Sequence, residues 1–311
     1  MTTVVKIGGA RAVDPDGALA DVAELVASGE QVVVVHGGST AVDETLEALG
    51  EEPEYVETPS GVVGRFTDER TMEVFEMVLP GKLNTDLTAG LLNEGVDAVG
   101  LSGVDGKLLA GPRKSAVRVQ EDGKKKIRRG DHSGTIKQVN ADLLETLLAG
   151  GYTPVATVPM AGKDGDREAR SASDSASGDD EEPRAKWLPV NADADRAAAA
   201  IAGALGADLV VLTDVSGVYA DPDDASTRID EVATPEDWSD LEDAAEGFMT
   251  KKVMAAEEAL EGGAASVAVA TANADAPVTS ALDGDATTIL PSALQSDDTA
   301  EDDADAEVSA Q

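Results

Sequence analysis

The 311-residue sequence contains no cysteine and only two histidines, His36 and His132. The absence of thiols excludes disulfides, thiolate zinc sites and a cysteine nucleophile, and two histidines are too few for a histidine-rich metal site. We therefore expect no metal held by the protein alone. No stretch reaches 18 apolar residues and no signal peptide is present, so the sequence predicts a cytoplasmic protein without a membrane partner.

Positive charge is also scarce. The chain has 24 lysines and arginines against 61 acidic residues, which gives a formal net charge of -37. Such a surface would repel a phosphate backbone, so nucleic acid is not an expected partner. A carboxylate-rich surface stays soluble in concentrated salt, where screening weakens self-repulsion, and this composition is typical of halophilic proteins.

Two common catalytic motifs are missing: the Gly-x-x-x-x-Gly-Lys-Ser/Thr loop of nucleotide triphosphatases and the Gly-x-Ser-x-Gly elbow of serine hydrolases. Two buried-strand patterns, residues 4–7 and 31–36, instead end in glycine pairs. Lys6 lies inside the first pattern, and because burying an unpaired ammonium is costly, it should reach solvent or meet an anion. Where a glycine turn opens onto a helix, its free N–H groups favour an anion, most often phosphate.

Apolar periodicity predicts alternating strands and helices, and hence an α/β fold: a three-layer αβα sandwich around a mainly parallel sheet. The predicted strands are 4–7, 31–36, 96–101, 153–158, 209–212, 266–270 and 287–290. The predicted helices are 16–28, 41–49, 69–79, 82–93, 135–148, one from 191–195 to Gly206, and 247–260. Residues 1–295 would form one domain with lobes at about 1–160 and 187–295, and the acidic segments 163–186 and 296–311 are predicted to be disordered.

Residues 107–137 reverse the overall charge, with ten basic and three acidic residues. Their middle is predicted to form a β-hairpin, 115–119 and 125–129, around a Glu-Asp-Gly turn. Lysines on such a hairpin can simply prevent edge pairing while remaining solvated. In so acidic a protein, a concentrated basic patch is also suited to an acidic partner. The candidate docking residues are Lys124, Lys125, Lys126, Arg128 and Arg129.

Phosphoryl transfer requires positive charge around the transferring oxygens more than it requires covalent help. Lys6, on the first strand, and Lys252, at the start of a helix, can supply that charge. Asp195, near the start of another helix, can align the two lysines. The alternatives are a surface position for Lys252 and a helix N-cap for Asp195.

Seven short motifs resemble the amino acid kinase family, and closely its acetylglutamate kinase branch. Each is weak alone, but they occur in the expected order from Val4 to Leu290. They are Lys6-x-Gly-Gly, His36-Gly-Gly, Gly64-Arg65, Gly134-x-x-x-x-Val139-Asn140, Asn191-x-x-x-Asp195, Thr213-Asp-Val-x-Gly-Val and Gly247-x-Met-x-x-Lys252.

The resemblance implies an ATP-dependent kinase of a side-chain carboxylate, with Mg²⁺ held mainly by the nucleotide phosphates. It implies that Lys6 and Lys252 stabilise the transferring phosphoryl group, that Asp195 organises both lysines, and that Gly9 and Gly38 donate backbone hydrogen bonds. The N-lobe would bind the amino-acid substrate through Gly37, Gly38, Ser39, Arg65 and Asn191, although Arg65 could also form only a surface ion pair. The C-lobe would bind ATP, with the implied contacts Gly8, Thr213, Asp214, Gly217, Tyr219 and Met249.

Other stretches are similar to kinases whose substrate is glutamate or 2-aminoadipate attached to a small acidic amino-group carrier protein. These stretches are Arg65-Phe-Thr-Asp-Glu-Arg-Thr-Met-Glu-Val-Phe75 and Arg129-Gly-Asp-His-Ser-Gly-Thr-Ile. The resemblance places such an enzyme in arginine or lysine biosynthesis and gives the basic hairpin a purpose. A kinase of free N-acetylglutamate and a non-catalytic nucleotide or amino-acid sensor are the alternatives. We expect a homodimer without arginine inhibition, because the hexamers of this family carry an extra helix before the first strand.

Overall fold

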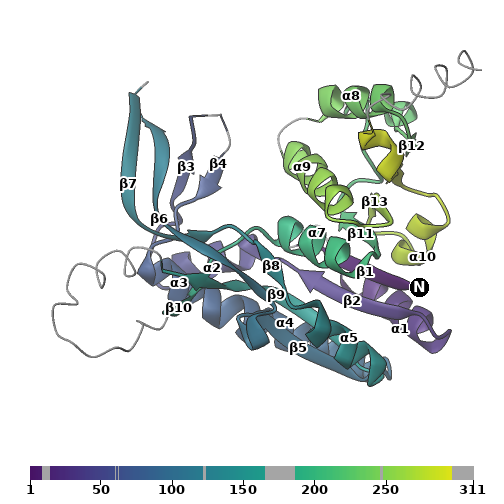
Figure 1. Cartoon of the computed structure of the whole chain (residues 1–311), viewed down its shortest axis with the longest axis horizontal. Coiled ribbons are helices and arrows are strands. Elements are labelled where there is room, and N and C mark those ends of the chain that lie inside the picture. Colours follow the sequence, from purple (N-terminus) through teal and green to yellow (C-terminus); the bar gives the residue numbers. More distant parts are fainter. Residues whose placement is uncertain are drawn as a thin grey trace, which may run out of the picture.

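The computed structural model describes residues 1–8, 15–59, 61, 63–121, 124–164, 186–245 and 248–295. The chain builds one large mixed sheet with helices on both faces (Figure 1). The strands along the main path of the sheet run in the order β12-β14-β13-β11-β1-β2-β9-β6-β7. Their bounds are β12 (Glu231–Val232), β14 (Thr287–Ile289), β13 (Ser266–Thr271), β11 (Asp208–Thr213), β1 (Thr2–Ile7), β2 (Gln31–His36), β9 (Thr153–Lys163), β6 (Leu109–Glu121) and β7 (Lys124–Gly134).

Most of the central pairings are parallel, as predicted: β1 with β2 and β11, β11 with β13, and β9 with β2. β5 (Ala98–Gly103) also pairs in parallel with β9, whereas β10 (Trp187–Val190) pairs antiparallel with it. β8 (Gln138–Val139) pairs antiparallel with β6. A separate two-stranded sheet joins β3 (Tyr55–Glu57) to β4 (Val63–Arg65).

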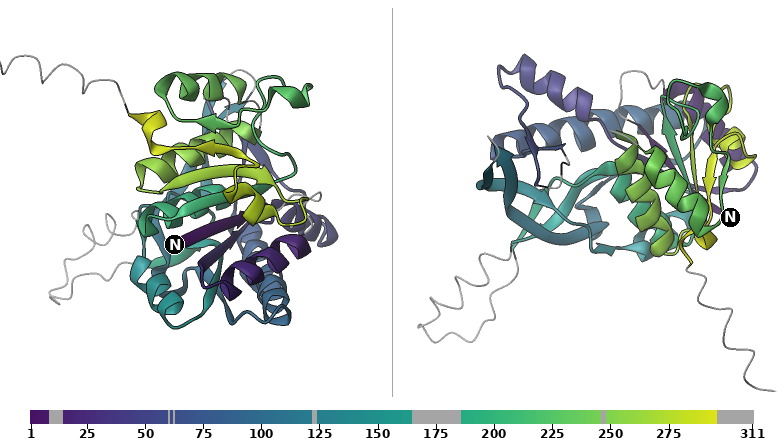
Figure 2. Two further views of the ribbon diagram at one scale, coloured as in Figure 1. Left: turned by 90° about the vertical axis from the view of Figure 1, so that its right-hand side faces the viewer. Right: turned by 90° about the horizontal axis from the view of Figure 1, so that it is seen from above.

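Side chains of the central strands alternate between two apolar cores, one on each face of the sheet. In β1, Val4 belongs to one core and Val5 to the other, and β2 alternates in the same way. The first core contains side chains of α2 (Ser39–Ala48), α3 (Glu69–Glu76), α5 (Ala141–Ala149), α7 (Ala194–Leu205), α8 (Pro235–Ala244) and α9 (Phe248–Glu261). The second contains side chains of α1 (Pro15–Ala27), α4 (Asn84–Asn93) and α10 (Pro277–Leu282). The predicted layered α/β fold is therefore confirmed, and its helices enclose the sheet from both sides (Figure 2).

The basic segment forms the predicted hairpin, which is longer than expected. β6 and β7 pair antiparallel from Arg113 with Gly134 to Glu121 with Lys124. The hairpin extends beyond the helical layers, with the β3–β4 hairpin beside it, and β3 contacts β6 (Figure 1). The predicted Asp-Gly part of the turn lies outside the described residues.

Three local predictions need correction. The helix predicted over 135–148 begins only at Ala141, because Asn140 caps it by accepting a hydrogen bond from the Leu143 N–H. Pro80-Gly81 does not separate two helices: a π-helix, η1 (Met77–Leu83), carries the chain from α3 into α4. This wider turn accommodates Pro80, which has no N–H to donate. Periodicity also missed the short helices α8 and α10.

The disorder predictions fall largely outside the described residues, which include only the ends of segment 163–186 and none of 296–311. Lys163 is the last residue of β9, and Lys186 immediately precedes β10. The division into two lobes stays a prediction. Among the described helices, none combines the length and apolarity needed to cross a membrane.

Candidate active site

Lys6 lies in the middle strand of the parallel region and is buried, with 5 % of its surface exposed. Its partners in register are Val35 on β2 and Val211 on β11, and both belong to the core that contains α7 and α9. Because parallel neighbours in register point to the same face, the Lys6 side chain points toward those helices. Of the two outcomes expected for Lys6, solvent or an anion, the structure shows the second, at the start of one of those helices.

Asp195 is that anion. It is the second residue of α7, and its carboxylate forms a buried ion pair with the Lys6 ammonium. Lys252 Nζ, on α9, lies 3.9 Å from Asp195 Oδ2, on the other side of the same carboxylate. Asp195 is not the N-cap of its helix, because Asp193 occupies that place and accepts from the N–H groups of Asp195 and Arg196. The structure thus brings Lys6, Asp195 and Lys252 together.

The charge state of Asp195 follows from these two neighbours. Burial alone would raise the pKa of the carboxyl group, but the positive charges of Lys6 and Lys252 outweigh burial and hold the pKa of Asp195 below its usual value. Asp195 is therefore ionised at neutral pH. One carboxylate between two ammonium groups leaves a net positive charge, which suits a phosphoryl group.

The second glycine turn, residues 37–39, lies beside this cluster. A methyl group added at Gly37 would lie 3.3 Å from Ala194 Cβ, one residue before Asp195. Gly38 has a φ of 157°, and a Cβ there would fall 2.3 Å from Leu83 Cδ1, so only glycine fits. Gly38 also precedes α2 as an N-cap without a side-chain hydrogen bond. The turn therefore presents backbone N–H groups at an uncapped helix start.

The first glycine turn is only partly described. Gly8 donates its N–H to Leu212 O at 3.2 Å, which extends the β1–β11 ladder. Gly9, implied as a backbone donor, lies outside the described residues.

His36 ends β2 directly before the second turn and is buried. Its Nδ1 lies 2.9 Å from Gly37 O, and its Nε2 lies 3.1 Å from the side-chain nitrogen of Asn84, which also donates to Val155 O at 2.8 Å. Because the Asn84 nitrogen can only donate, His36 Nε2 accepts and Nδ1–H donates to Gly37 O. Burial lowers the pKa of His36 to about 4, with Lys6 adding to the effect against the opposing hydrogen bond to Gly37, so the imidazole is neutral.

Arg65 lies at the end of β4 beside the same turn. Its guanidinium forms an ion pair with Asp43 of α2 and donates to Tyr55 Oη at 2.8 Å and to Ser39 O at 3.2 Å. The structure thus shows an ion pair for Arg65 and also places Arg65 next to Ser39, its predicted companion at the substrate. A substrate carboxylate binding here would meet a guanidinium that already faces Asp43.

Asn191 contacts Thr67 and the base of the basic hairpin. Its side-chain nitrogen donates to Thr67 Oγ1 at 2.9 Å, and its backbone joins His132 and Gly134 of β7. Thr67 is fully buried, and its N–H approaches Asp131 Oδ1 at 3.4 Å while its carbonyl accepts from the His132 N–H at 2.7 Å. Thr67 therefore connects Asn191, the base of the basic hairpin and the segment after Arg65.

The implied nucleotide residues follow β11, at the edge where β1 and β2 also end in glycines. Ligands of open parallel sheets bind at this edge. Thr213 ends β11 and donates through its hydroxyl to Asp214 Oδ1 at 2.9 Å. Gly217 passes Thr287 so closely that a Cβ would fall 2.6 Å from its hydroxyl oxygen, and the Tyr219 backbone bridges to Arg228. Met249, on α9, packs at the margin of the first core.

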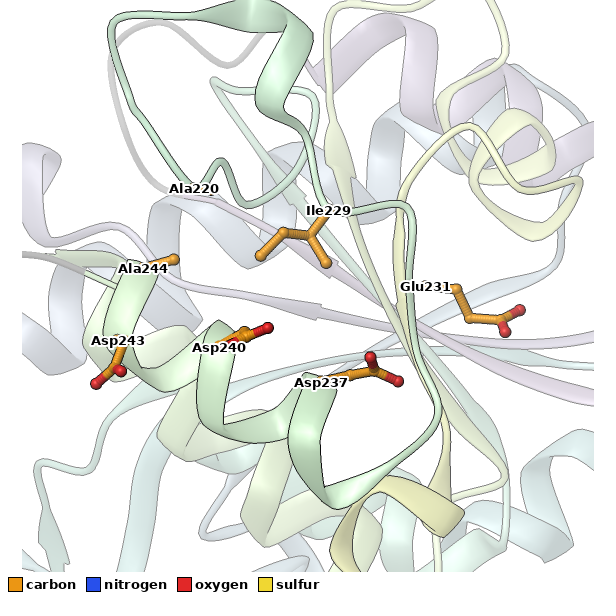
Figure 3. A pocket seen from close by; sticks show the side chains of 7 residues that line it. All are labelled: Ala220, Ile229, Glu231, Asp237, Asp240, Asp243 and Ala244. Carbon is orange, nitrogen blue, oxygen red and sulfur yellow. The ribbon is translucent and has the colours of Figure 1, made fainter.

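A pocket of about 370 Å³ lies next to this segment (Figure 3). Asp237, Asp240, Asp243 and Ala244 of α8 line one side, and Ala220, Ile229 and Glu231 line the other. It contains none of Lys6, Asp195 and Lys252. Its four carboxylates would repel phosphate, so the pocket does not suit the phosphates of a nucleotide.

The register of the basic hairpin divides its cations between two faces. Residues paired across an antiparallel ladder share a face. Val119, which is buried, pairs with Lys126, and Val117 pairs with Arg128. Arg128 turns toward the protein: it donates to Glu54 Oε2 at 2.6 Å, and its guanidinium carbon lies 4.1 Å from the centre of the Phe66 ring.

The opposite face of the hairpin is directed to solvent. Lys125, Ile127 and Arg129 alternate along β7 and are exposed, and Arg118 of β6, the partner of Ile127, is exposed too. Ile127 is 67 % exposed, which is unusual for a large aliphatic side chain between cations. We call these four residues the outward face. Of the five predicted docking residues, only Lys125 and Arg129 belong to it.

Within the described ranges, no three histidine, aspartate or glutamate side chains gather closely enough to hold a metal ion. The positive charge of the cluster around Asp195 comes from Lys6 and Lys252.

Sequence reasoning missed several residues of the site. Asn84 and Thr67 act through contacts 48 and 124 residues away along the chain, to His36 and Asn191, which no local pattern reveals. Asp43 was also missed. Arg118 was counted in the basic segment, and the strand alternation that places it with Lys125 and Arg129 was a usable signal.

Comparisons with known proteins agree with this geometry. The sequence pattern of the amino acid kinase family matches residues 1–271. The chain is 42 % identical over 287 residues to a "[LysW]-aminoadipate kinase" of Deinococcus radiodurans, covering 92 % of this chain and 90 % of the relative. It is 39 % identical to an "Acetylglutamate kinase" of Methanopyrus kandleri over 263 residues, 84 % of this chain and 91 % of the relative.

Among solved structures, N-acetylglutamate synthase from Neisseria gonorrhoeae, complexed with coenzyme A and N-acetyl-glutamate, superimposes with a TM-score of 0.67 at 22 % identity. The match covers 93 % of this chain and 59 % of that one. At this identity the likeness concerns the fold.

Proposed function

Because the chain belongs to the amino acid kinase family and is an ATP-dependent phosphotransferase with a carboxyl acceptor, we propose that it phosphorylates the side chain of 2-aminoadipate or glutamate borne on a small acidic carrier protein. The pathway would be the biosynthesis of lysine or arginine. The observation that carries the proposal is the outward face of the basic hairpin, a cationic surface on a chain of net charge -37. A free amino acid derivative needs no such surface, whereas an acidic carrier does.

The lysine–aspartate cluster supplies the chemistry. A carboxylate oxygen of the substrate attacks the γ-phosphorus of ATP, ADP leaves, and an acyl phosphate forms. Lys6 and Lys252 neutralise charge on the moving phosphoryl group, and Asp195 keeps both ammonium groups in place. Mg²⁺ would be held mainly by the nucleotide phosphates, as the family resemblance implies.

For the remaining site residues we propose the roles that the family resemblance implies. Gly38 would donate its N–H to the phosphoryl group, Arg65 and Ser39 would hold the substrate backbone, and residues 213–219 with Met249 would bind the nucleotide. Arg65 is supported by its contact with Ser39 O, which places both beside the second glycine turn. Asn191 is the least direct, since its side chain is bonded to Thr67.

Purified enzyme with ATP tests the proposal directly when ADP release is measured with three acceptors: carrier-linked 2-aminoadipate, carrier-linked glutamate and free N-acetylglutamate. Rapid turnover of a carrier-linked acceptor is expected. The ratio of kcat/KM between the two carrier forms then assigns the side-chain length. The Methanopyrus kandleri relative favours free N-acetylglutamate as the second candidate, and turnover of that compound alone would replace the proposal with it.

Reversing charge on the outward face should weaken carrier recognition. Lys125→Glu/Arg129→Glu is expected to raise KM for the carrier-linked substrate about tenfold or more while changing KM for ATP less than about twofold, because like charges now oppose an acidic partner. The Debye length is only about 3 Å at 1 M salt, so the effect that survives in molar salt measures short-range contacts within the interface.

The matched control reverses two lysines on the other face of the same strand. Lys124→Glu/Lys126→Glu changes the net charge equally. These lysines are exposed as well, but they lie on the face of the strand that carries Arg128, so the variant should raise carrier KM less. The gap between the two variants should persist in molar salt, where only short-range contacts act. Equal carrier KM values for parent and outward-face variant across the salt series would leave the hairpin merely solvated.

We also propose that the enzyme is a homodimer adapted to high salt, as the family resemblance and the acidic composition suggest. Light scattering in molar KCl should give about twice the 31.7 kDa of one chain. A hexameric mass would rule the dimer out.

A further inference from the structure

The turn that carries Gly38 is held from behind by a buried pair of side chains. His36 donates from Nδ1 to Gly37 O at 2.9 Å, and Asn84 donates to His36 Nε2 at 3.1 Å. Asn84 is itself fixed by its second hydrogen bond, to Val155 O at 2.8 Å on the neighbouring strand β9. Both side chains are buried, so the contacts are protected from competition by water.

The peptide geometry turns this anchor into an orientation. Gly37 O belongs to the peptide group that also carries the Gly38 N–H, and in a trans peptide the carbonyl and the N–H point in opposite directions. Fixing the carbonyl toward His36 therefore fixes the Gly38 N–H away from it. Within the described part of the chain, no acceptor pairs with that N–H, and Leu79 and Leu83 close the space on the side where a Cβ would stand.

Glycine makes such an anchor necessary. Gly38 has no side chain to restrict its backbone, and α2, which follows, has no side-chain cap to fix the turn. The π-helix η1 delivers both supports, because Leu79 and Leu83 belong to it and Asn84 directly follows it.

We propose that His36, oriented by Asn84, is a positioning residue that aims the Gly38 N–H at the phosphoryl group during transfer. The inference rests on the proposed function, because it assumes that Gly38 faces the transferring group. It assigns His36 no contact with substrate and no proton transfer. A donor at the Nδ1 position is the single requirement.

Two amide substitutions distinguish the hydrogen bond made by Nδ1 of the imidazole from the one made by Nε2. Asparagine can place its nitrogen near Nδ1 and keep the bond to Gly37 O, but it leaves Asn84 without its acceptor. Glutamine can reach the Nε2 position and keep Asn84 bonded, but it gives up the bond to Gly37 O. We expect His36→Asn to keep kcat within about threefold of the parent and His36→Gln to lower kcat by about 30- to 100-fold, with KM for ATP nearly unchanged.

The free energy of unfolding in urea, measured for each variant, separates a loss of catalysis from a loss of stability. His36→Asn should be the less stable of the two variants because of the orphaned Asn84 donor, so stability and kcat should rank in opposite orders. The control Thr157→Val removes the buried hydrogen bond from Thr157 Oγ1 to His36 O at 3.0 Å; it should cost stability and leave kcat within about threefold.

Two results overturn the inference: equal loss of kcat in both amide variants, or a kcat that follows stability across the set. If the parent enzyme itself transfers no phosphate to any of the acceptors, the proposed function is refuted instead, so the two failures are distinguishable.

Discussion

Alanine at Lys6 will lower kcat by about 10²- to 10³-fold and will also destabilise the protein, whereas alanine at Lys252 will lower kcat comparably with little loss of stability. In the proposed mechanism both ammonium groups serve the transferring phosphoryl group, but of the two only Lys6 is in direct contact with the Asp195 carboxylate. Removing Lys6 leaves a buried carboxylate without its closest counter-charge, which costs about 3 kcal/mol. Lys252 Nζ, at 3.9 Å, contributes much less to that pair.

Initial rates and urea unfolding of the two variants measure the contrast, with Lys251→Ala as the matched control on the same helix. Lys251 donates to Val63 O at 2.8 Å. Its charge has the smallest effect of the three lysines that lower the pKa of Asp195, so its loss should change kcat by less than about threefold. Full activity in Lys252→Ala would remove that residue from the site.

Asp195→Asn is expected to lower kcat by about 10²- to 10³-fold. Without the carboxylate, the ammonium groups of Lys6 and Lys252 lie close together in a buried site with no anion between them. They repel each other and lose the positions that phosphoryl transfer would require. Initial rates at saturating ATP and carrier-linked substrate measure the loss.

Asp193→Asn is the control two residues away. Asparagine keeps a side-chain oxygen for the two N–H groups at the start of α7, so helix and activity should both persist. An Asp195→Asn enzyme with the rate of the parent would show that the carboxylate does not organise the lysines.

The sequence was sufficient for features that local chemistry decides. A cation inside an apolar run indicated that Lys6 should reach solvent or meet an anion, and the structure shows the anion, Asp195. The glycine pairs after β1 and β2 marked the edge of the sheet where the candidate site lies. The predicted helix boundaries were wrong at two places. The cap at Asn140 makes α5 begin later than predicted, and a π-helical turn continues the helix through Pro80 and Gly81. Charge contrast located the hairpin, but only the strand register revealed that Arg118, Lys125 and Arg129 share a face and that Arg128 lies on the other one.

Contacts between distant segments lay beyond sequence reasoning. Asn84 meets His36, and Thr67 meets Asn191, because the sheet brings their elements together, and neither polar residue differs in local pattern from an ordinary helix or loop residue. Arg65 shows the same limit, because its partner Asp43 comes from α2, 22 residues away.

The tight packing at Gly38 constrains evolutionary change as well as chemistry. Gly38 has a φ of 157°, which residues with a side chain rarely adopt, and a Cβ there would also fall 2.3 Å from Leu83 Cδ1 and 2.8 Å from Leu79 Cδ2. Other residues are therefore disfavoured whatever their effect on phosphate binding. An invariant glycine among descendants of this chain would record the backbone conformation of the turn together with its packing against the π-helix. Replacement of His36 by asparagine, but not by glutamine, among those descendants would separately reflect what catalysis requires at this position.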